Sequence, residues 1–277
     1  ALCWFSENSL QLRGNDVLVE TQPFPDDSLT RNVMLRLTAL VTLLVMSATV
    51  FADDNWPMFR GPGARGIADH PDLPDRWSET ENILWKLPIP GRGWSSPIVS
   101  GDRVFVATVT REGTPESAKP GLYFGGNRAK PDDVIHEWKL LCLSLKDGRE
   151  LWQKTLHRDK PKTARHLKNS YASETPVTDG ERVYALFGDV GLFCLTVTGE
   201  PVWSKPLPPC RTRFDWGTAS SPVLHGDRIY MVSDSEDESY LAAFDKHTGD
   251  QLWRVARDEG SNWATPFVWE NEIRTEI

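Results

Sequence analysis

The sequence predicts an all-β fold, a β-propeller of four-stranded antiparallel blades, of which this 277-residue chain carries about three and a half. Three observations support the prediction: one segment recurs four times, each full recurrence contains two successive hairpins, and no convincing helical segment separates them. Four antiparallel strands repeated about every 45 to 50 residues are typical of propeller blades, in which radial repetition protects the sheet edges. A parallel β-helix would need shorter coils, and a sandwich would not repeat so regularly.

The first hairpin of each unit is marked by a proline and a glycine. It reads "WSSPIVSGDRVFVAT" from Trp94, "ASETPVTDGERVYALFG" from Ala172 and "ASSPVLHGDRIYMVS" from Ala219, and a fourth copy begins at Trp263. A glycine follows the proline by four positions in the first three copies, at Gly101, Gly180 and Gly226. This pattern predicts a strand, a tight turn and a second strand.

The second hairpin of each unit ends in a tryptophan. It reads "CLSLKDGRELW", "CLTVTGEPVW" and "AAFDKHTGDQLW", with a glycine four positions before Trp152, Trp203 and Trp253. The third copy resembles the tryptophan-docking motif of the pyrroloquinoline-quinone (PQQ) type propellers, A-x-D-x-x-T-G-x-x-x-W, through Ala243, Asp245, Thr248, Gly249 and Trp253. The first copy has Cys142, Ser144 and Asp147 at three of these positions, and the second copy is one residue shorter.

The resemblance covers Asp54 to the C-terminus, including the opening "DNWPMFRGPGARG", and has structural implications. In that family the tryptophan packs between blades against the glycine turn of the next copy, which implies a structural role for Trp152, Trp203 and Trp253 and for Gly148, Gly199 and Gly249. Asp245 and Thr248 are expected to form their turn. Family propellers commonly close the ring with an N-terminal strand, and we expect Ile83 to Leu87, which contains Trp85, to be that strand, although the blade that it should complete is missing from this sequence.

The segment that ends at Ala52 predicts export. Met34 to Arg36 is a short basic start, Leu37 to Met46 is an apolar run, and small residues at Val50 and Ala52 suit cleavage. We therefore expect an upstream segment absent from the mature protein over 1–33, a signal peptide over 34–52, a lead-in with the ring-closing strand over 53–93, and a partial propeller, truncated at its C-terminus, over 94–277. The apolar run is short for a membrane span and no cysteine follows it, so a periplasmic or extracellular protein of a bacterial type, not a lipoprotein, is expected.

Composition makes several other functions less favourable. The net charge of -8 argues against a nucleic-acid partner, because phosphate binding usually requires a basic surplus. The six histidines and four cysteines lack metal-ligand spacing, and no catalytic motif is present. We predict no catalytic residue and no metal site, and a disulfide among Cys142, Cys194 and Cys210 stays open, with burial as small apolar residues the usual role of such cysteines.

The long connections are expected on one face. Strands alternate in direction, so the second-to-third strand connections and the inter-blade connections must lie together, opposite the tight turns. That face would gather cationic residues with interleaved aromatic residues (Tyr123, Phe124), and the candidate partner or ligand residues are Arg165, His166, Lys168, Arg211, Arg213 and Trp216. The insertion between Val109 and Glu137 is expected to be a surface loop or a lid. A protein partner or a small anionic or carbohydrate ligand would suit these loops, and a solvated loop set with no ligand is the alternative.

Two functions follow from the resemblance. One is an exported, non-catalytic interaction or ligand-binding scaffold, like the propeller subunit of the outer-membrane assembly machinery. The other is part of a quinoprotein dehydrogenase that oxidises alcohols or sugars with PQQ and calcium. Quinoprotein alcohol dehydrogenases typically stack the quinone on adjacent cysteines, and no two cysteines are adjacent here. The lack of adjacent cysteines favours an interaction or ligand-binding scaffold, which would need neither PQQ nor calcium, over a quinoprotein dehydrogenase.

Overall fold

The computed structural model describes residues 55–68, 73–114 and 130–277. By its internal contacts the chain divides into Ala1–Ala52 and Asp53–Ile277. The predicted upstream segment and signal peptide, and the aromatic residues Tyr123 and Phe124, lie outside the described residues. Among the described residues, no helix is long and apolar enough to cross a membrane.

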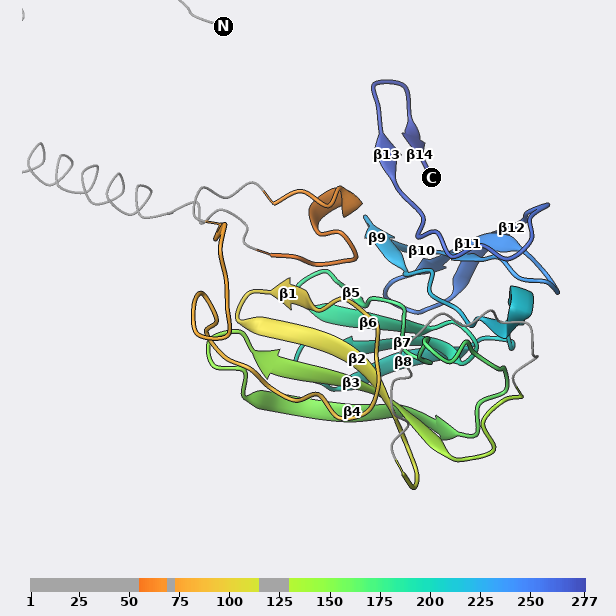
Figure 1. Ribbon diagram of the computed structural model, residues 1–277. Coiled ribbons are helices and arrows are strands. Elements are labelled where there is room, and N and C mark those ends of the chain that lie inside the picture. The colour runs from red at the N-terminus through yellow and green to blue at the C-terminus, as the bar shows by residue number, and fades with distance from the viewer. Residues whose placement is uncertain (1–54, 69–72, 115–129) are drawn as a thin grey trace, which may run out of the picture. The chain divides into compact units, whose positions relative to one another are not determined.

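Three four-stranded antiparallel sheets and one two-stranded sheet follow each other along the chain, which confirms the predicted fold (Figure 1). Blade one comprises β1 (Ile98–Ser100), β2 (Arg103–Arg111), β3 (His136–Ser144) and β4 (Glu150–Asp159). Blade two comprises β5 (Val177–Thr178), β6 (Arg182–Phe187), β7 (Gly191–Thr196) and β8 (Pro201–Pro206). Blade three comprises β9 (Val223–His225), β10 (Arg228–Ser233), β11 (Tyr240–Asp245) and β12 (Gln251–Ala256), and β13 (Trp269–Glu270) with β14 (Thr275–Glu276) begins a fourth unit. Within the described residues, the helical elements are two short 3-10 turns, η1 (Pro62–Ala64) and η2 (Arg213–Asp215).

The cores lie between neighbouring blades. Side chains alternate across a strand, so both faces of a central blade must be apolar. In β6, Val183 and Phe187 join the cluster shared with blade one, whereas Tyr184 and Leu186 join the cluster shared with blade three. This explains why almost the whole of β6 is buried. The fourth strands, β4, β8 and β12, are the most exposed and form the outer edges.

A β-bulge recurs at the same place in all three blades. Cys142, Cys194 and Ala243 on the third strands lie directly opposite Trp152, Trp203 and Trp253, and the register shifts immediately after each pair. Directly opposite residues in an antiparallel pair share one face of the sheet. A small residue there leaves room for the indole, which explains why cysteine can replace the alanine of the motif.

Each indole of the first two blades covers a buried glycine of the next blade. Trp152 lies over Gly199, and Trp203 lies over Gly249. A Cβ added at Gly199 would come within 2.8 Å of the Trp152 ring, and one added at Gly249 would come within 2.6 Å of the Trp203 ring. Both glycines have positive φ, at 90° and 72°, which favours glycine. The indole Nε1 groups donate to Val197 O at 3.0 Å and Lys246 O at 3.1 Å.

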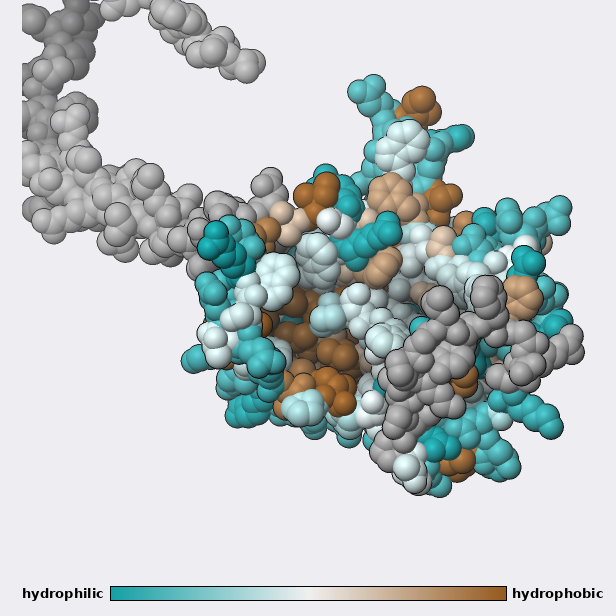
Figure 2. Space-filling model, viewed as in Figure 1, coloured by the Kyte–Doolittle hydropathy of each residue, from teal (hydrophilic) through white to brown (hydrophobic). Residues whose placement is uncertain are grey.

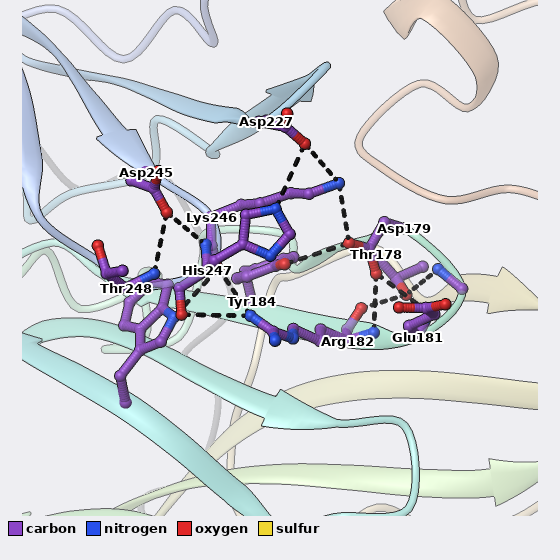
Figure 3. A network of polar contacts seen from close by, with 12 residues as sticks. Thr178, Asp179, Glu181, Arg182, Tyr184, Asp227, Asp245, Lys246, His247 and Thr248 are labelled. Carbon is purple, nitrogen blue, oxygen red and sulfur yellow. Dashed lines mark hydrogen bonds and ion pairs between the residues drawn. The ribbon is translucent and has the colours of Figure 1, made fainter.

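The turn between β11 and β12 connects blades two and three (Figure 3). Asp245 Oδ1 accepts hydrogen bonds from the backbone N–H groups of His247 and Thr248, and Thr248 Oγ1 accepts one from Asp250 N. Lys246 Nζ lies 3.5 Å from Asp179 of blade two and 3.2 Å from Asp227 of blade three. Burial alone would raise the pKa of Asp179, but backbone hydrogen bonds from Arg182 and Glu181 and the charge of Lys246 outweigh it, so that pKa is lowered.

Ile83–Leu87, the expected ring-closing strand, pairs with no strand of the described residues, and the blade that it should complete is not among them, so this expectation stays a prediction. Its tryptophan nevertheless makes the inter-blade contact. The Trp85 ring lies 2.5 Å from the Cβ position of Gly148, and its Nε1 donates to Leu145 O at 2.9 Å. Trp85 therefore occupies the place toward blade one that Trp152 occupies toward blade two.

The lead-in adds backbone pairing beside β1. Trp56 and Val99 exchange two backbone hydrogen bonds of 2.9 Å, and Thr178 of β5 donates to Pro57 O at 2.9 Å. Since β1 and β5 are neighbours, this segment runs beside the first strands of blades one and two. The sequence gives no sign of this pairing, because "DNWPMFRG" lacks an alternating pattern.

A hydroxyl group precedes the proline in every unit and joins the blades. The backbone N–H of Ser96 donates to Thr175 Oγ1 at 3.0 Å, that of Thr175 to Ser221 Oγ at 2.9 Å, and that of Ser221 to Thr265 Oγ1 at 3.1 Å. The hydroxyls of Thr175, Ser221 and Thr265 thus each satisfy a backbone donor that has no strand partner. We call these four residues the hydroxyl belt.

Candidate functional site

The long connections lie on one face, as expected from strand alternation. The connections 160–176 and 207–222 contact each other, since Asn169 Nδ2 donates to Trp216 O at 2.7 Å. The β10–β11 turn joins them, because Glu236 N donates to Arg211 O at 2.9 Å. The β2–β3 connection reaches the same end through the ion pair of Lys160 with Asp133 at 2.7 Å. We call this surface the long-loop face. The predicted lid between Val109 and Glu137 lies partly outside the described residues.

The structure brings four of the six candidate residues close together. His166 and Trp216 meet edge to face at 6.2 Å, and Arg213 lies over the ring of Phe214, which in turn contacts Trp216. Lys168 N donates to His166 Nδ1 at 3.2 Å.

The other two candidates have structural partners. Arg165 Nη1 donates to the carbonyls of His166 and Asn169, and its guanidinium lies over Tyr171. Arg211 binds Asp237 through Nε at 3.2 Å and Nη2 at 2.8 Å, and this hydrogen bond raises the pKa of Arg211.

Two aromatic residues of the surface were missed by the sequence reasoning. Trp263 packs against Trp216 with ring centroids 5.5 Å apart, and Phe214 is 51% exposed beside it. Together with His166 they form a surface that we call the aromatic patch (His166, Phe214, Trp216 and Trp263). Its contacts combine three separate segments, which is why no local spacing indicates it. The single signal is that Trp263 lies three positions before the proline of the fourth repeat, where the first repeat also has a tryptophan, Trp94.

The backbone beneath the patch is strained. Phe214 and Asp215 both have φ of 55°, a region that bulky residues rarely adopt and that costs roughly 1–2 kcal/mol per residue. Surrounding hydrogen bonds hold this conformation: Asp215 N donates to Thr212 O at 3.0 Å, and Arg213 N donates to Ser261 Oγ at 2.7 Å. Strain that the surroundings enforce is concentrated at functional sites in proteins.

A cavity of about 190 Å³ lies at the end of blade one, where Val109, Thr110 and His136 are part of its lining. Arg92, Arg111 and Arg165 line it together with His136 and Tyr171. Arg111 is paired with Asp132 at 3.1 Å. Burial is the main cause that lowers the pKa of His136; the Val134 carbonyl and Asp132 oppose it, and Arg111 and Arg165 add to it. The imidazole is therefore neutral at pH 7, and the guanidinium groups set the positive charge of the lining.

A buried carboxyl group lies beneath the face. Glu174 is 2% exposed and accepts hydrogen bonds from Ser173 N at 3.2 Å and Gly188 N at 3.1 Å. Burial raises the pKa of Glu174 to about 7 despite these donors. Neither Glu174 nor its surroundings repeat in the other blades, so the repeat pattern gave no signal for them.

Most of the surface visible in Figure 2 is hydrophilic, with an apolar recess over blade one. The fold and the loops together define a propeller-type protein that presents one face of long, non-repeating connections.

A family model described as outer membrane protein assembly factor BamB matches residues 137–267. The outer membrane protein assembly factor BamB of Burkholderia pseudomallei (strain K96243) is 24% identical over 205 residues, 67% of this chain and 50% of that protein. This chain thus spans about half the length of the curated relative that it matches. These matches agree with the resemblance of the repeat to the PQQ-like β-propeller repeats over the residues that they cover.

The solved structures to which this chain is similar include a BamB protein and a quinohemoprotein alcohol dehydrogenase. BamB from Moraxella catarrhalis is 16% identical with a TM-score of 0.38, and the match covers 65% of this chain and 56% of that one. Quinohemoprotein alcohol dehydrogenase from Comamonas testosteroni is 12% identical with a TM-score of 0.45, and the match covers 77% of this chain and 28% of that one.

The described residues do not fit a quinone centre. Cys142, Cys194 and Cys210 are free, buried thiols in separate places, so they provide no pair of adjacent cysteines as a stacking surface. Burial raises the pKa of the Cys142 and Cys194 thiols to about 12, which keeps both protonated and inert. Within the described ranges, no group of three or more His, Cys, Asp or Glu side chains could hold a metal ion.

Proposed function

We propose that this protein is an exported, non-catalytic interaction scaffold that binds a protein partner through the aromatic patch of its long-loop face. The observation that carries the proposal is the exposed Phe214, held in a strained conformation against Trp216 and beside Arg213. Aromatic residues and arginine dominate the binding energy of protein interfaces, where they sit at the centre of the contact.

Two further observations support this proposal. The loops are long and non-repeating, whereas the opposite face consists of tight turns whose polar groups are used to connect the blades. The curated relative is an outer membrane protein assembly factor by name. We infer by analogy that this chain, too, serves as a binding subunit in the cell envelope.

Site-specific photocrosslinking in the cell envelope tests the proposal. A photoreactive phenylalanine analogue at position 214 should give a discrete crosslinked product with one envelope protein. The same analogue at position 252, where Leu252 is 47% exposed on the outer strand β12, is the matched control and should give none. Equal products from both positions, or none from position 214, would contradict the proposal.

A small anionic ligand is a second candidate, favoured by the three arginines that line the cavity of about 190 Å³. Titration calorimetry with inorganic phosphate and with a sulfated sugar would test it. We expect saturable binding that weakens at least tenfold in Arg165→Gln, whereas Arg211→Gln, paired with Asp237 outside the cavity, should bind normally. Binding that is absent, or equal in the two variants, would exclude this candidate.

A further inference from the structure

A cleft of about 370 Å³ opens between the outer parts of blades one and two, at the end that carries the long connections. Its lining comes from β3, β4, β7 and β8, from the β6–β7 turn and from the connections that follow β4 and β8. All of these segments belong to or directly follow the first two blades, which are complete four-stranded sheets. Pockets of roughly 300–1,000 Å³ are typical of ligand sites, so the cleft is large enough to hold one.

The cleft is open because one turn is short. In blade three, the β10–β11 turn reaches the preceding inter-blade connection through its backbone, since Glu236 N donates to Arg211 O at 2.9 Å. The corresponding β6–β7 turn of blade two, 188–190, has three residues. It reaches its inter-blade connection through a side chain, because Asp189 Oδ2 accepts a hydrogen bond from Thr163 Oγ1 at 2.6 Å. The short turn therefore leaves the space beside the connection uncovered.

The walls of the cleft are apolar. Leu156 of blade one lines it together with Val190, Phe193 and Leu207, and all four side chains are half-buried. Leu156, Val190 and Phe193 pack against the core cluster that blades one and two share, so their inner surfaces are fixed. Their outer surfaces are available to a ligand, and removing such apolar area from water favours association.

Two lysines lie at the rim of the cleft. Lys160 and Lys162 are exposed and Pro161 between them is buried, so both lysine side chains point away from the protein core. Lys160 pairs with Asp133 at 2.7 Å, but the Asp133 side chain is 92% exposed, and such an ion pair contributes little to stability. A ligand carboxylate can therefore replace Asp133. Lys162 is in no ion pair of the described residues.

The carboxylate of the lining is shielded from a ligand. Asp189 is 5% exposed and is held by Thr163. Burial is the main cause that raises the pKa of Asp189, and the Thr163 hydrogen bond and the charges of His157 and Lys162 oppose it. The cleft therefore presents apolar walls and two ammonium groups to the solvent, in a chain whose net charge is -8. This combination is complementary to a ligand that is both apolar and anionic.

We propose that this cleft binds an extended acidic peptide, whose carboxylates pair with Lys160 and Lys162 and whose apolar side chains pack on Phe193 and Leu207. The residue before a proline favours the extended conformation, and side chains two positions apart in an extended chain lie about 6.6 Å apart on the same side. The two lysines thus match two carboxylates that are also two positions apart. A small amphiphile with one anionic group would use a single lysine. The proposal does not rest on the aromatic patch, and either surface can fail its test while the other passes.

Fluorescence anisotropy of a labelled peptide tests the cleft. The probe is the fluorescein-labelled peptide Gly-Asp-Leu-Asp-Leu-Gly, and its binding to the full chain should be saturable and should weaken as NaCl is added. The same peptide with lysine in place of aspartate should not bind, and the one with serine in place of leucine should bind at least fivefold more weakly. In the double variant Lys160→Gln, Lys162→Gln, the Kd of the acidic peptide should rise at least tenfold.

The double variant Lys86→Gln, Lys146→Gln is the matched control. It removes the same charge from two exposed lysines outside the lining, and its Kd should stay within twofold of the wild-type value. Carbodiimide coupling, which joins a carboxylate to a neighbouring amine, gives a second readout: mass spectrometry should find the peptide on Lys160 or Lys162 and not on Lys146. Absent binding, or equal weakening in the two double variants, would overturn the proposal. Octanoate that binds at least as tightly as the peptide, with the same dependence on the two lysines, would assign the cleft to a small amphiphile and overturn it as well.

Discussion

Trp203→Ala removes the contact that joins blades two and three. In the structure the indole lies 2.6 Å from the Cβ position of Gly249, donates to Lys246 O at 3.1 Å and contacts Tyr184 at 5.9 Å. Truncation of a packed tryptophan costs about 3–5 kcal/mol, and the hydrogen bond adds roughly 1 kcal/mol. Because Trp203 is only half-buried, we expect a total loss of about 3 to 5 kcal/mol in the free energy of unfolding.

Urea unfolding followed by circular dichroism measures this loss at pH 7. Trp253→Ala is the matched control, since Trp253 is also half-buried and follows the same bulge, but among the described residues it covers no glycine turn. We expect the control to lose about 1 to 2 kcal/mol, mainly from its contact with Tyr230. A loss under about 1 kcal/mol for Trp203→Ala, or equal losses in the two variants, would show that the docking contact does not hold the blades together.

Three other predictions concern the joints between blades. Gly249→Ala should lower the free energy of unfolding by about 2 kcal/mol or more in the same urea assay, because φ is 72° and the new Cβ would meet the Trp203 ring. An unchanged free energy of unfolding would contradict the close contact between Gly249 and the Trp203 ring. Ser221→Ala should lower the free energy of unfolding by about 1–3 kcal/mol, because the buried N–H of Thr175 loses its acceptor. Ser221→Thr should be tolerated, since the hydroxyl belt has threonine at other positions. Equal losses in the two variants would exclude the hydroxyl as the cause. The pKa of Asp179 is lower in the folded state, so its stabilisation is present above pH 4 and disappears as the pH falls below it; the stability difference between wild type and Asp179→Asn should shrink from pH 7 to pH 3.

The sequence predicted the blades because their physical requirements repeat. The proline, the turn glycine and the final tryptophan recur at fixed places, and the substitution of Cys142 for alanine did not obscure the unit, since the position requires only a small side chain opposite Trp152. The hydroxyl belt could also have been found, because a serine or threonine precedes the proline in all four copies.

The unpredicted features are those that do not repeat. The aromatic patch combines Trp216 and Trp263 from different connections, and spacing within either segment gives no sign of their contact. The pairing of Arg211 with Asp237 depends on the β10–β11 turn, whose position no motif fixes. The docking of Trp85 on the turn of blade one does not depend on a strand at Ile83–Leu87, because the tryptophan makes the contact through its ring and Nε1.

The scaffold proposal is tested most directly by the affinity of the partner that crosslinks at position 214. Fluorescence titration of that partner should give a Kd at least tenfold higher for Phe214→Ala than for wild type, a loss of about 1.4 kcal/mol or more. Leu252→Ala on the outer strand should change the Kd less than twofold. A Kd that Phe214→Ala leaves unchanged, or that both substitutions raise equally, would contradict binding through the aromatic patch.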